Sequence, residues 1–176
     1  MSANRILYRV FQFWKAFEGV LAPEELEPAR AVLSHRQMSL FEKLHPSEQR
    51  HSLRVMRALQ GQGENHPDLL KAALLHDVGK TCHPLRPFER VLIVLSEAAF
   101  PRLAERWGQG SARGWRRPFV VAKQHPKWGA EMSADADVSP ITQSLIRRHQ
   151  EQLSPEEPTH LEDRLLVLLQ RADDQS

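Results

Sequence analysis

The sequence contains little cysteine, little net charge and no long apolar run, and each absence excludes something. Cys82 is the only cysteine in the 176 residues, so no disulfide can form within the chain and a reducing, cytoplasmic location is expected. The 24 basic and 22 acidic residues leave a formal net charge of +2, which excludes strong attraction of the whole molecule to nucleic acid. Arg5, Arg9 and Lys15 interrupt the apolar N-terminus. We therefore expect neither a signal peptide nor a membrane span, and no membrane or stable nucleic-acid partner.

Strand signals are also missing, because no segment alternates apolar and polar residues while helical periodicity runs along most of the chain. This pattern and the length predict one all-α domain. Gln109–Pro118, rich in glycine and arginine, is the one clear loop. Two prolines lie inside helical patterns: Pro28 is expected to kink or divide its helix, and Pro126 to break one. The expected helices cover residues 4–20, 23–34, 37–44, 46–61, 68–78, 87–95, 101–107, 119–125, 126–134 and 141–152, and a last helix capped by Thr159 runs through Asp173.

The first 45 residues are expected to form additional N-terminal helices that pack on the rest of the domain, residues 46–176. Four aromatic side chains of the predicted helix 4–20 supply a strong apolar anchor for this packing: Phe11, Phe13, Trp14 and Phe17. A surface that binds a partner protein is the alternative use of these side chains.

The adjacent residues His76 and Asp77 are the first candidates for chemistry. They follow the apolar run Ala72–Leu75, at the end of the helix with the most buried pattern in the chain. Burying an unpaired imidazole and carboxylate costs several kcal/mol, so the pair needs a partner, and a divalent cation satisfies both groups. A carboxylate can also bridge two metal ions through its two oxygens. The alternative is a histidine that favours a helix C-terminus, with Asp77 as a solvated cap.

Other candidate ligands are scattered along the chain. His51, His125, His149 and Asp173 each lie on or at the end of a different predicted helix, and a helical bundle can bring such positions to one point. No two of them are spaced i, i+4 as in a zinc protease, so local spacing does not establish a site. Taken singly, each histidine is more typical of an ordinary surface or core residue.

The stretch from Ala72 to Lys80, AALLHDVGK, resembles the signature of the HD-domain superfamily of metal-dependent phosphohydrolases. That family has an ordered pattern: a histidine, an adjacent His-Asp pair, two further histidines in many branches, and a C-terminal aspartate. The resemblance covers about residues 46–173 and implies an HD-domain helical bundle. The pattern is matched in order by His51, His76, Asp77, His125, His149 and Asp173.

The resemblance implies a binuclear metal site. His51, His76, Asp77 and Asp173 would hold the first ion, and Asp77 would bridge to a second. His125 and His149 would complete the second position. A mixed histidine and carboxylate shell suits one or two divalent transition metals, without choosing among iron, manganese, zinc, cobalt and nickel.

Several cationic residues are candidates for binding or acting on a phosphate. By the resemblance, Lys80 reaches a substrate phosphate and acts with Asp77 in catalysis, although a solvated lysine after a helix end is the alternative. Arg148 offers bidentate donation to phosphate, or is an ordinary surface arginine. Arg116 and Arg117, in the predicted loop, would contact phosphate or a base, or remain solvated.

Departures from the family pattern narrow the expected activity. The branch that cleaves cyclic di-GMP has a histidine where this chain has Arg148, and its Gly-Tyr-Pro motif is missing here. Cleavage of cyclic di-GMP is therefore not expected. Asp173 stands three residues from the end of the sequence, and the neighbouring Asp174 is the alternative ligand.

The resulting expectation is a metal-dependent phosphohydrolase that cleaves a phosphate ester or anhydride of a small nucleotide-like substrate. Two alternatives stay open: a di-iron oxygenase of the same fold, and a non-catalytic domain that senses a nucleotide. A homodimer is also left open.

Overall fold

The computed structural model describes residues 19–153 and 160–176, and within these ranges it is helical without strands. The predicted all-α fold is confirmed. The α-helices are α2 (Pro23–Arg30), α3 (His35–Phe41), α4 (Pro46–Gly61), α5 (Pro67–Leu75), α6 (Pro87–Ala99), α7 (Pro101–Trp107), α8 (Arg117–Asp135), α9 (Pro140–Arg148) and α10 (Leu161–Gln175). Two 3-10 helices lie between them, η1 (Val78–Cys82) and η2 (Gly114–Arg116).

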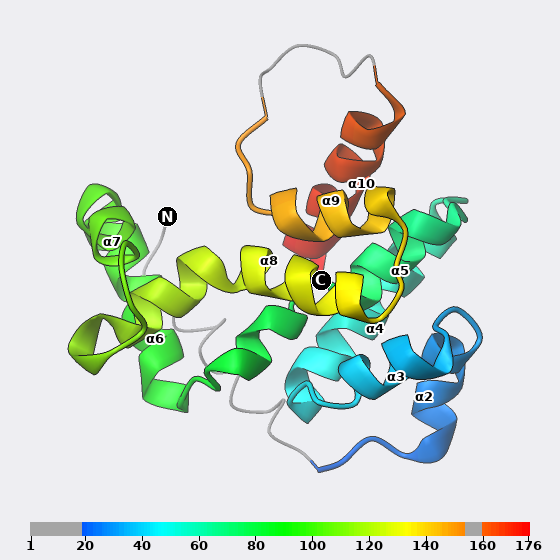
Figure 1. Cartoon of the computed structure of the whole chain (residues 1–176), viewed down its shortest axis with the longest axis horizontal. Helices are drawn as coiled ribbons and strands as arrows, with labels where there is room; N and C mark the ends of the chain where they lie inside the picture. Colours follow the sequence, from blue (N-terminus) through cyan, green and yellow to red (C-terminus); the bar gives the residue numbers. More distant parts are fainter. Residues whose placement is uncertain (1–18, 154–159) are drawn as a thin grey trace.

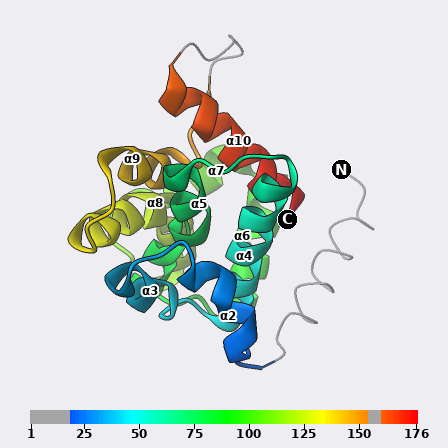
Figure 2. The same cartoon turned by 90° about the vertical axis from the view of Figure 1, so that its right-hand side faces the viewer.

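Helix α5 lies between α4 and α9 (Figures 1 and 2). It packs against α4, α9 and α10. Every apolar side chain from Leu69 to Leu75 is buried, as expected for a helix that is apolar on most of its circumference. Its C-terminus, which carries His76, therefore lies inside the bundle rather than at the surface.

Proline residues define where many of the helices begin. The predicted starts at Pro46, Pro87, Pro101 and Pro140 are confirmed, because a proline in the first turn needs no hydrogen-bond partner for its missing N–H. The predicted cap before the last of these is also present, since the Ser139 hydroxyl accepts a hydrogen bond from the Thr142 amide at 3.0 Å.

The most instructive wrong boundary is at Pro126. The sequence predicts two helices separated there, but α8 continues through the proline from Arg117 to Asp135. Packing on both sides explains this, because α8 contacts η1 and α9 along its length and tertiary contacts outweigh the local cost of proline.

Other boundaries also differ from the expectation. Helix α5 ends at Leu75 rather than Val78, α9 ends at Arg148 rather than Gln152, and α6 extends to Ala99. Pro28 lies within α2, which ends at Arg30. The predicted helix 4–20 falls almost entirely, and the predicted Thr159 cap entirely, outside the described residues.

Two further parts of the chain, α3 and the pair α6 and α7, pack on the outside of this bundle. Helix α3 packs on α5 and α8, and its Met38 and Phe41 join the same buried apolar cluster as the α5 leucines. Helices α6 and α7 pack on each other and on α8, at one end of the molecule (Figure 1). The division of the chain at residue 45 stays a prediction. In the described part of the chain, no helix is both long and apolar enough to cross a membrane.

Candidate metal centre

Five helices deliver the six candidate ligands to one region. Helices α4, α8 and α10 each carry one ligand, and another directly follows the last residue of α9. The junction of α5 and η1 supplies the adjacent pair. The side chains are His51, His76, Asp77, His125, His149 and Asp173.

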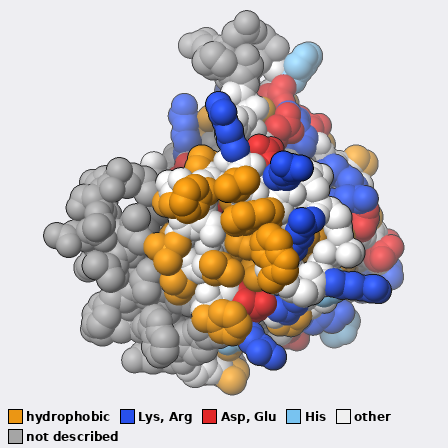
Figure 3. Space-filling view, turned by 90° about the vertical axis from the view of Figure 1, so that its left-hand side faces the viewer, with side chains coloured by type: hydrophobic (Ala, Val, Ile, Leu, Met, Phe, Trp, Pro, Cys, Tyr) orange, Lys and Arg blue, Asp and Glu red, His pale blue; other side chains and the backbone are white. Residues whose placement is uncertain are grey.

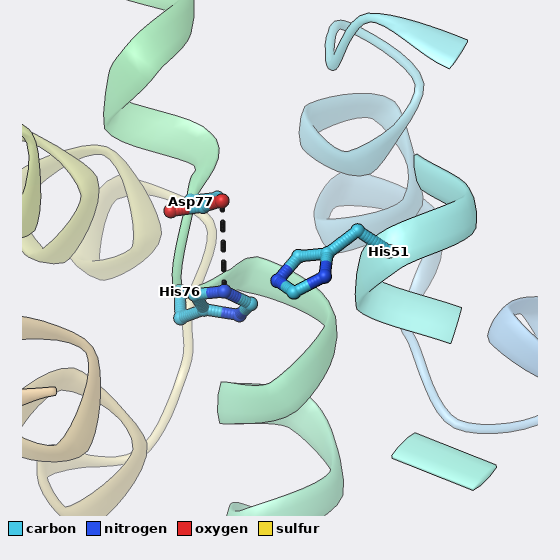
Figure 4. Close-up of side chains that lie close together, drawn as sticks. All are labelled: His51, His76 and Asp77. Carbon is cyan, nitrogen blue, oxygen red and sulfur yellow. Dashed lines mark ion pairs between the residues drawn. The ribbon is translucent and has the colours of Figure 1, made fainter. Parts of the chain in front are cut away.

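The first cluster joins α4 to the end of α5. Ligand atoms of His51, His76 and Asp77 all lie within 4.8 Å of one another (Figure 4). The Nε2 atom of His76 lies 3.6 Å from an oxygen of Asp77 and 3.6 Å from Oδ1 of Asp173. That Asp173 oxygen is also 2.7 Å from Nε2 of His51. The structure thus places Asp173 beside this cluster, whereas Asp174 is exposed.

The second cluster shares Asp77 with the first. Ligand atoms of Asp77, His125 and His149 again lie within 4.8 Å of one another. Nε2 of His125 is 3.2 Å from Oδ1 of Asp77 and 3.3 Å from Nε2 of His149. Because the two oxygens of Asp77 face different clusters, its carboxylate is placed to bridge two ions.

Backbone carbonyl groups orient three of the imidazole rings. The Nδ1 atom of His76 lies 2.9 Å from the Ala73 carbonyl, and that of His149 lies 2.8 Å from the Ile146 carbonyl. Both histidines follow the last residue of a helix, where carbonyls of the final turn have no amide partner in the helix. A carbonyl only accepts, so each Nδ1 carries the proton and each Nε2 offers a lone pair to the centre.

Pro126 supplies the corresponding carbonyl for His125, in the middle of a helix. The amide that would bond the Ala122 carbonyl belongs to residue 126, and proline has no N–H. The Nδ1 atom of His125 instead donates to this carbonyl and to that of Val121, both at 3.0 Å. The proline that the sequence marks as a helix break thus fixes the orientation of a candidate ligand.

The electrostatics of the cluster suit a cation. Nε2 lone pairs of His125 and His149 face each other at 3.3 Å in a buried space, an arrangement that a shared positive charge relieves. Burial lowers the pKa of His149 to about 3, and repulsion from His76 and His125 adds to this. Burial alone would raise the pKa of Asp77, but Lys80 and His76 outweigh it and hold the pKa well below its usual value. Neutral imidazoles and an ionised carboxylate are the forms that bind metal.

The turn that carries Asp77 lies directly against the backbone of α8. A Cβ atom added to Gly79 would overlap the His125 carbonyl and approach the Gly129 amide nitrogen to 2.6 Å. Only glycine allows the two backbones to come so close. This contact sets the position of one candidate ligand, Asp77, relative to another, His125.

Lys80 is held beside the cluster by two carboxylates. Its Nζ atom lies 2.6 Å from Asp77 and 3.6 Å from Glu48, whose side chain also pairs with Arg90 of α6. Burial alone would lower the pKa of Lys80, but the two carboxylates raise it, so this lysine stays protonated. No motif in the sequence singles out Glu48 or Arg90. Glu48 precedes His51 by three residues on the same helix, which is the signal that could have found it.

A pocket of about 430 Å³ opens over three of the candidate ligands, His51, Asp77 and His125. Its apolar lining comes from both α6 and α8, and includes Ile93, Val94 and Val121. Charged groups around it include Lys80, Arg90 and Arg54, and Arg54 is exposed. This volume is in the range of sites for small molecules.

The predicted substrate-binding arginines lie elsewhere. Arg148 forms ion pairs with Glu151, Glu162 and Asp163, at 2.7–2.9 Å. It lines a neighbouring pocket of about 630 Å³ rather than the one over the ligands. The predicted roles of Arg148, Arg116 and Arg117 in binding a substrate stay predictions.

The two loop arginines have different surroundings. The Arg117 guanidinium pairs with the buried Glu89 at 2.6 Å and so ties α8 to α6. The Arg116 guanidinium lies 5.2 Å from the centre of the Trp115 ring, at the surface.

Comparison with known families tests the expected family. The family model described as HD domain matches residues 49–174, which is more than half of the chain. The chain belongs to the HD-domain family. No curated protein and no solved structure matches it. The matched region of this HD-domain protein contains all six candidate ligands, and the donor set that they form fits a divalent metal.

Proposed function

We propose that this HD-domain protein is a metal-dependent phosphohydrolase acting on a small nucleotide-like phosphate ester or anhydride. The observation that carries the proposal is the bridging position of Asp77 between two clusters of imidazole Nε2 atoms. His51, His76, Asp77 and Asp173 would hold one divalent ion, while Asp77, His125 and His149 would hold a second. Bound ions would supply hydroxide from water near neutral pH and would neutralise charge on the phosphoryl oxygens.

The residues of the pocket give the substrate its position. Lys80, kept protonated by Asp77 and Glu48, binds a phosphate oxygen as a cation and does not act as a base. Arg54 is exposed at the pocket and supplies a second cationic donor. The apolar wall, with Ile93 and Val121, receives the ring of the substrate and excludes water from its face. The pocket volume favours a substrate of about one nucleotide.

The test combines metal analysis with a substrate panel. Protein purified without added metal is loaded with Mn²⁺ under argon and assayed for phosphate release from nucleoside monophosphates, phosphodiesters and dinucleoside polyphosphates. We expect Asp77→Asn to lose both bound metal and activity. Lys80→Met should keep the metal and lose about 100-fold in kcat, as for loss of one transition-state donor. Lys43→Met, at an exposed position outside the pocket, is the matched control.

Other outcomes would identify the alternatives. If the metal-loaded protein hydrolyses nothing in the panel but binds a nucleotide, the domain is a sensor and the proposal is wrong. Turnover that requires both iron and oxygen would indicate the di-iron oxygenase. Stoichiometric metal in Asp77→Asn and His125→Ala alike would contradict the metal centre itself.

A further inference from the structure

Residues 86–117 form a lobe whose outer surface is unusually apolar. We call this segment, which comprises α6, α7 and η2 with their flanking residues, the arginine lobe. Among the described residues, nine large apolar side chains are exposed, and seven of them belong to this lobe. Figure 3 shows hydrophobic side chains gathered on the face of the molecule at the end where α6 and α7 lie. The seven are Phe88, Leu92, Val94, Leu95, Phe100, Leu103 and Trp115.

The two sides of α6 serve different purposes. Phe88, Leu92 and Leu95 are spaced i, i+4, i+7 and form one stripe, exposed by 63%, 42% and 48%. The side that faces the protein carries the buried Glu89 and Ile93. The core therefore does not need the outer stripe, and an exposed apolar face of this extent indicates an interaction surface.

The charge of the arginine lobe differs from that of the rest of the chain. It contains seven arginines and three glutamates, a net charge of +4, whereas the remaining 17 basic and 19 acidic residues sum to −2. Two of its glutamates face cations: Glu89 is paired with Arg117 and Glu105 lies 3.4 Å from Lys123. Two of the arginines do not face outward, since Arg90 pairs with Glu48 and Arg117 with Glu89. The other five are exposed, so the outer surface combines apolar side chains with cations: Arg86, Arg102, Arg106, Arg113 and Arg116.

We propose that the arginine lobe binds peripherally to an anionic lipid bilayer. Apolar side chains that enter the region between headgroups and acyl chains, flanked by cations that attract anionic headgroups, are the features of such surfaces. Four of the seven apolar residues are aliphatic and have no ring on which a base could stack, so single-stranded nucleic acid fits this surface less well. The sequence expectation of no membrane partner is the opposite prediction, and the test below decides between the two. The lipid-binding proposal does not depend on the proposed hydrolase activity.

Vesicle flotation with the full chain tests this proposal. The probes are vesicles of phosphatidylcholine alone and of phosphatidylcholine mixed with phosphatidylglycerol. We expect binding only to the anionic vesicles, and weaker binding at high salt because surface charges are screened. Leu92→Gln/Leu95→Gln should abolish flotation. Arg102→Gln/Arg106→Gln should weaken it about 30-fold, since one arginine near an anionic surface contributes a factor of about five.

Matched variants outside the arginine lobe serve as controls. Lys43→Gln/Arg57→Gln removes two exposed cations, and Leu161→Gln removes one exposed apolar side chain; both should float as wild type does. Unchanged metal content and melting temperature show that every variant is folded. Absence of wild-type flotation overturns the proposal, as does flotation of the Leu92→Gln/Leu95→Gln variant. A wild-type dimer that this variant converts to a monomer, without vesicle binding, would assign the face to a second copy of the chain.

Discussion

At the scale of single residues, the candidate metal centre depends on backbone carbonyls that helices leave without an amide partner. His76 and His149 use carbonyls at helix C-termini, and His125 uses the carbonyl that Pro126 leaves free. The proton on each Nδ1 is therefore fixed before any ion binds, and each Nε2 is ready as a ligand. The carbonyl groups left unpaired by the helices are thus the same groups that set the tautomer and orientation of the candidate histidine ligands.

Replacing Pro126 by alanine separates its effect on the stability of α8 from its effect on the orientation of His125. An alanine amide would bond the Ala122 carbonyl and compete with the His125 ring for it. We expect the free energy of unfolding to rise by about 1–3 kcal/mol, because proline in a helix interior costs about 3 kcal/mol. Metal affinity should fall about 10-fold, as for loss of an outer hydrogen bond to a ligand. Urea unfolding and titration calorimetry with Mn²⁺ measure the two effects.

Pro28→Ala is the matched control, because Pro28 also lies within a helix but belongs to α2, outside the metal centre. It should stabilise the protein and leave metal affinity unchanged. Equal metal affinity in Pro126→Ala and wild type would show that the Ala122 carbonyl does not orient the ring.

The sequence predicted the candidate ligands themselves better than the neighbouring residues that hold them in position. Burial of His76 and Asp77 followed from the apolar run before them, and the family pattern added the four distant residues. The partners Glu48 and Arg90 were missed, because their charges are ordinary in a helix until the fold brings α6 against α4. The effect of Pro126 was also missed, since the proline was interpreted only as a helix break.

At the scale of secondary structure, the contact between η1 and α8 positions the centre. Gly79→Ala should lower the free energy of unfolding by about 3 kcal/mol, the upper range for overpacking, because the new methyl group meets backbone atoms that cannot move separately. Gly61→Ala is the control, since a Cβ at Gly61 meets nothing within 4 Å and should stabilise α4 by about 0.5–1 kcal/mol. Urea unfolding of both variants measures the difference. Similar stabilities would contradict the close backbone contact.

The presence of a helix was predictable where the apolar periodicity and the position of a proline agreed, as for α4 and α9. Element ends were predicted less well where tertiary contacts decide them. Helix α5 ends at Leu75 because the chain turns into η1 to meet α8, and no local residue pattern encodes that contact.

At the scale of the whole molecule, the candidate ligands connect five helices that are far apart in the sequence. An ion bound there links those helices only in the folded state, so metal should stabilise the entire domain. With ligand at about 100 times the dissociation constant, the gain is about 2.7 kcal/mol. For a chain of this size, the melting temperature should then rise by about 5–10 °C.

Thermal unfolding in EDTA and in excess Mn²⁺ measures this stabilisation. Asp77→Asn, which removes the shared ligand, should melt at the same temperature in both conditions. A wild-type melting temperature that does not respond to metal would exclude an ion that joins these helices.

The sequence could not predict the exposed face of the arginine lobe. Helix α6 carries a stripe of large apolar residues, and such a stripe is typical of a helix that packs on a core. Only the arrangement of α6 and α7 at one end of the molecule shows that the stripe of Phe88, Leu92 and Leu95 has no described helix over it.

The contact of Gly79 with the His125 carbonyl has a consequence for how related chains diverge. The backbones of η1 and α8 touch without a side chain between them, so neither glycine can be replaced by a residue with a Cβ atom unless the other segment moves. A relative that acquires a larger residue at the position of Gly79 must displace its equivalent of α8, and with it one of the imidazoles. We therefore expect the positions of Gly79 and Gly129 to change together across the family, or to remain glycine wherever both clusters of ligands persist.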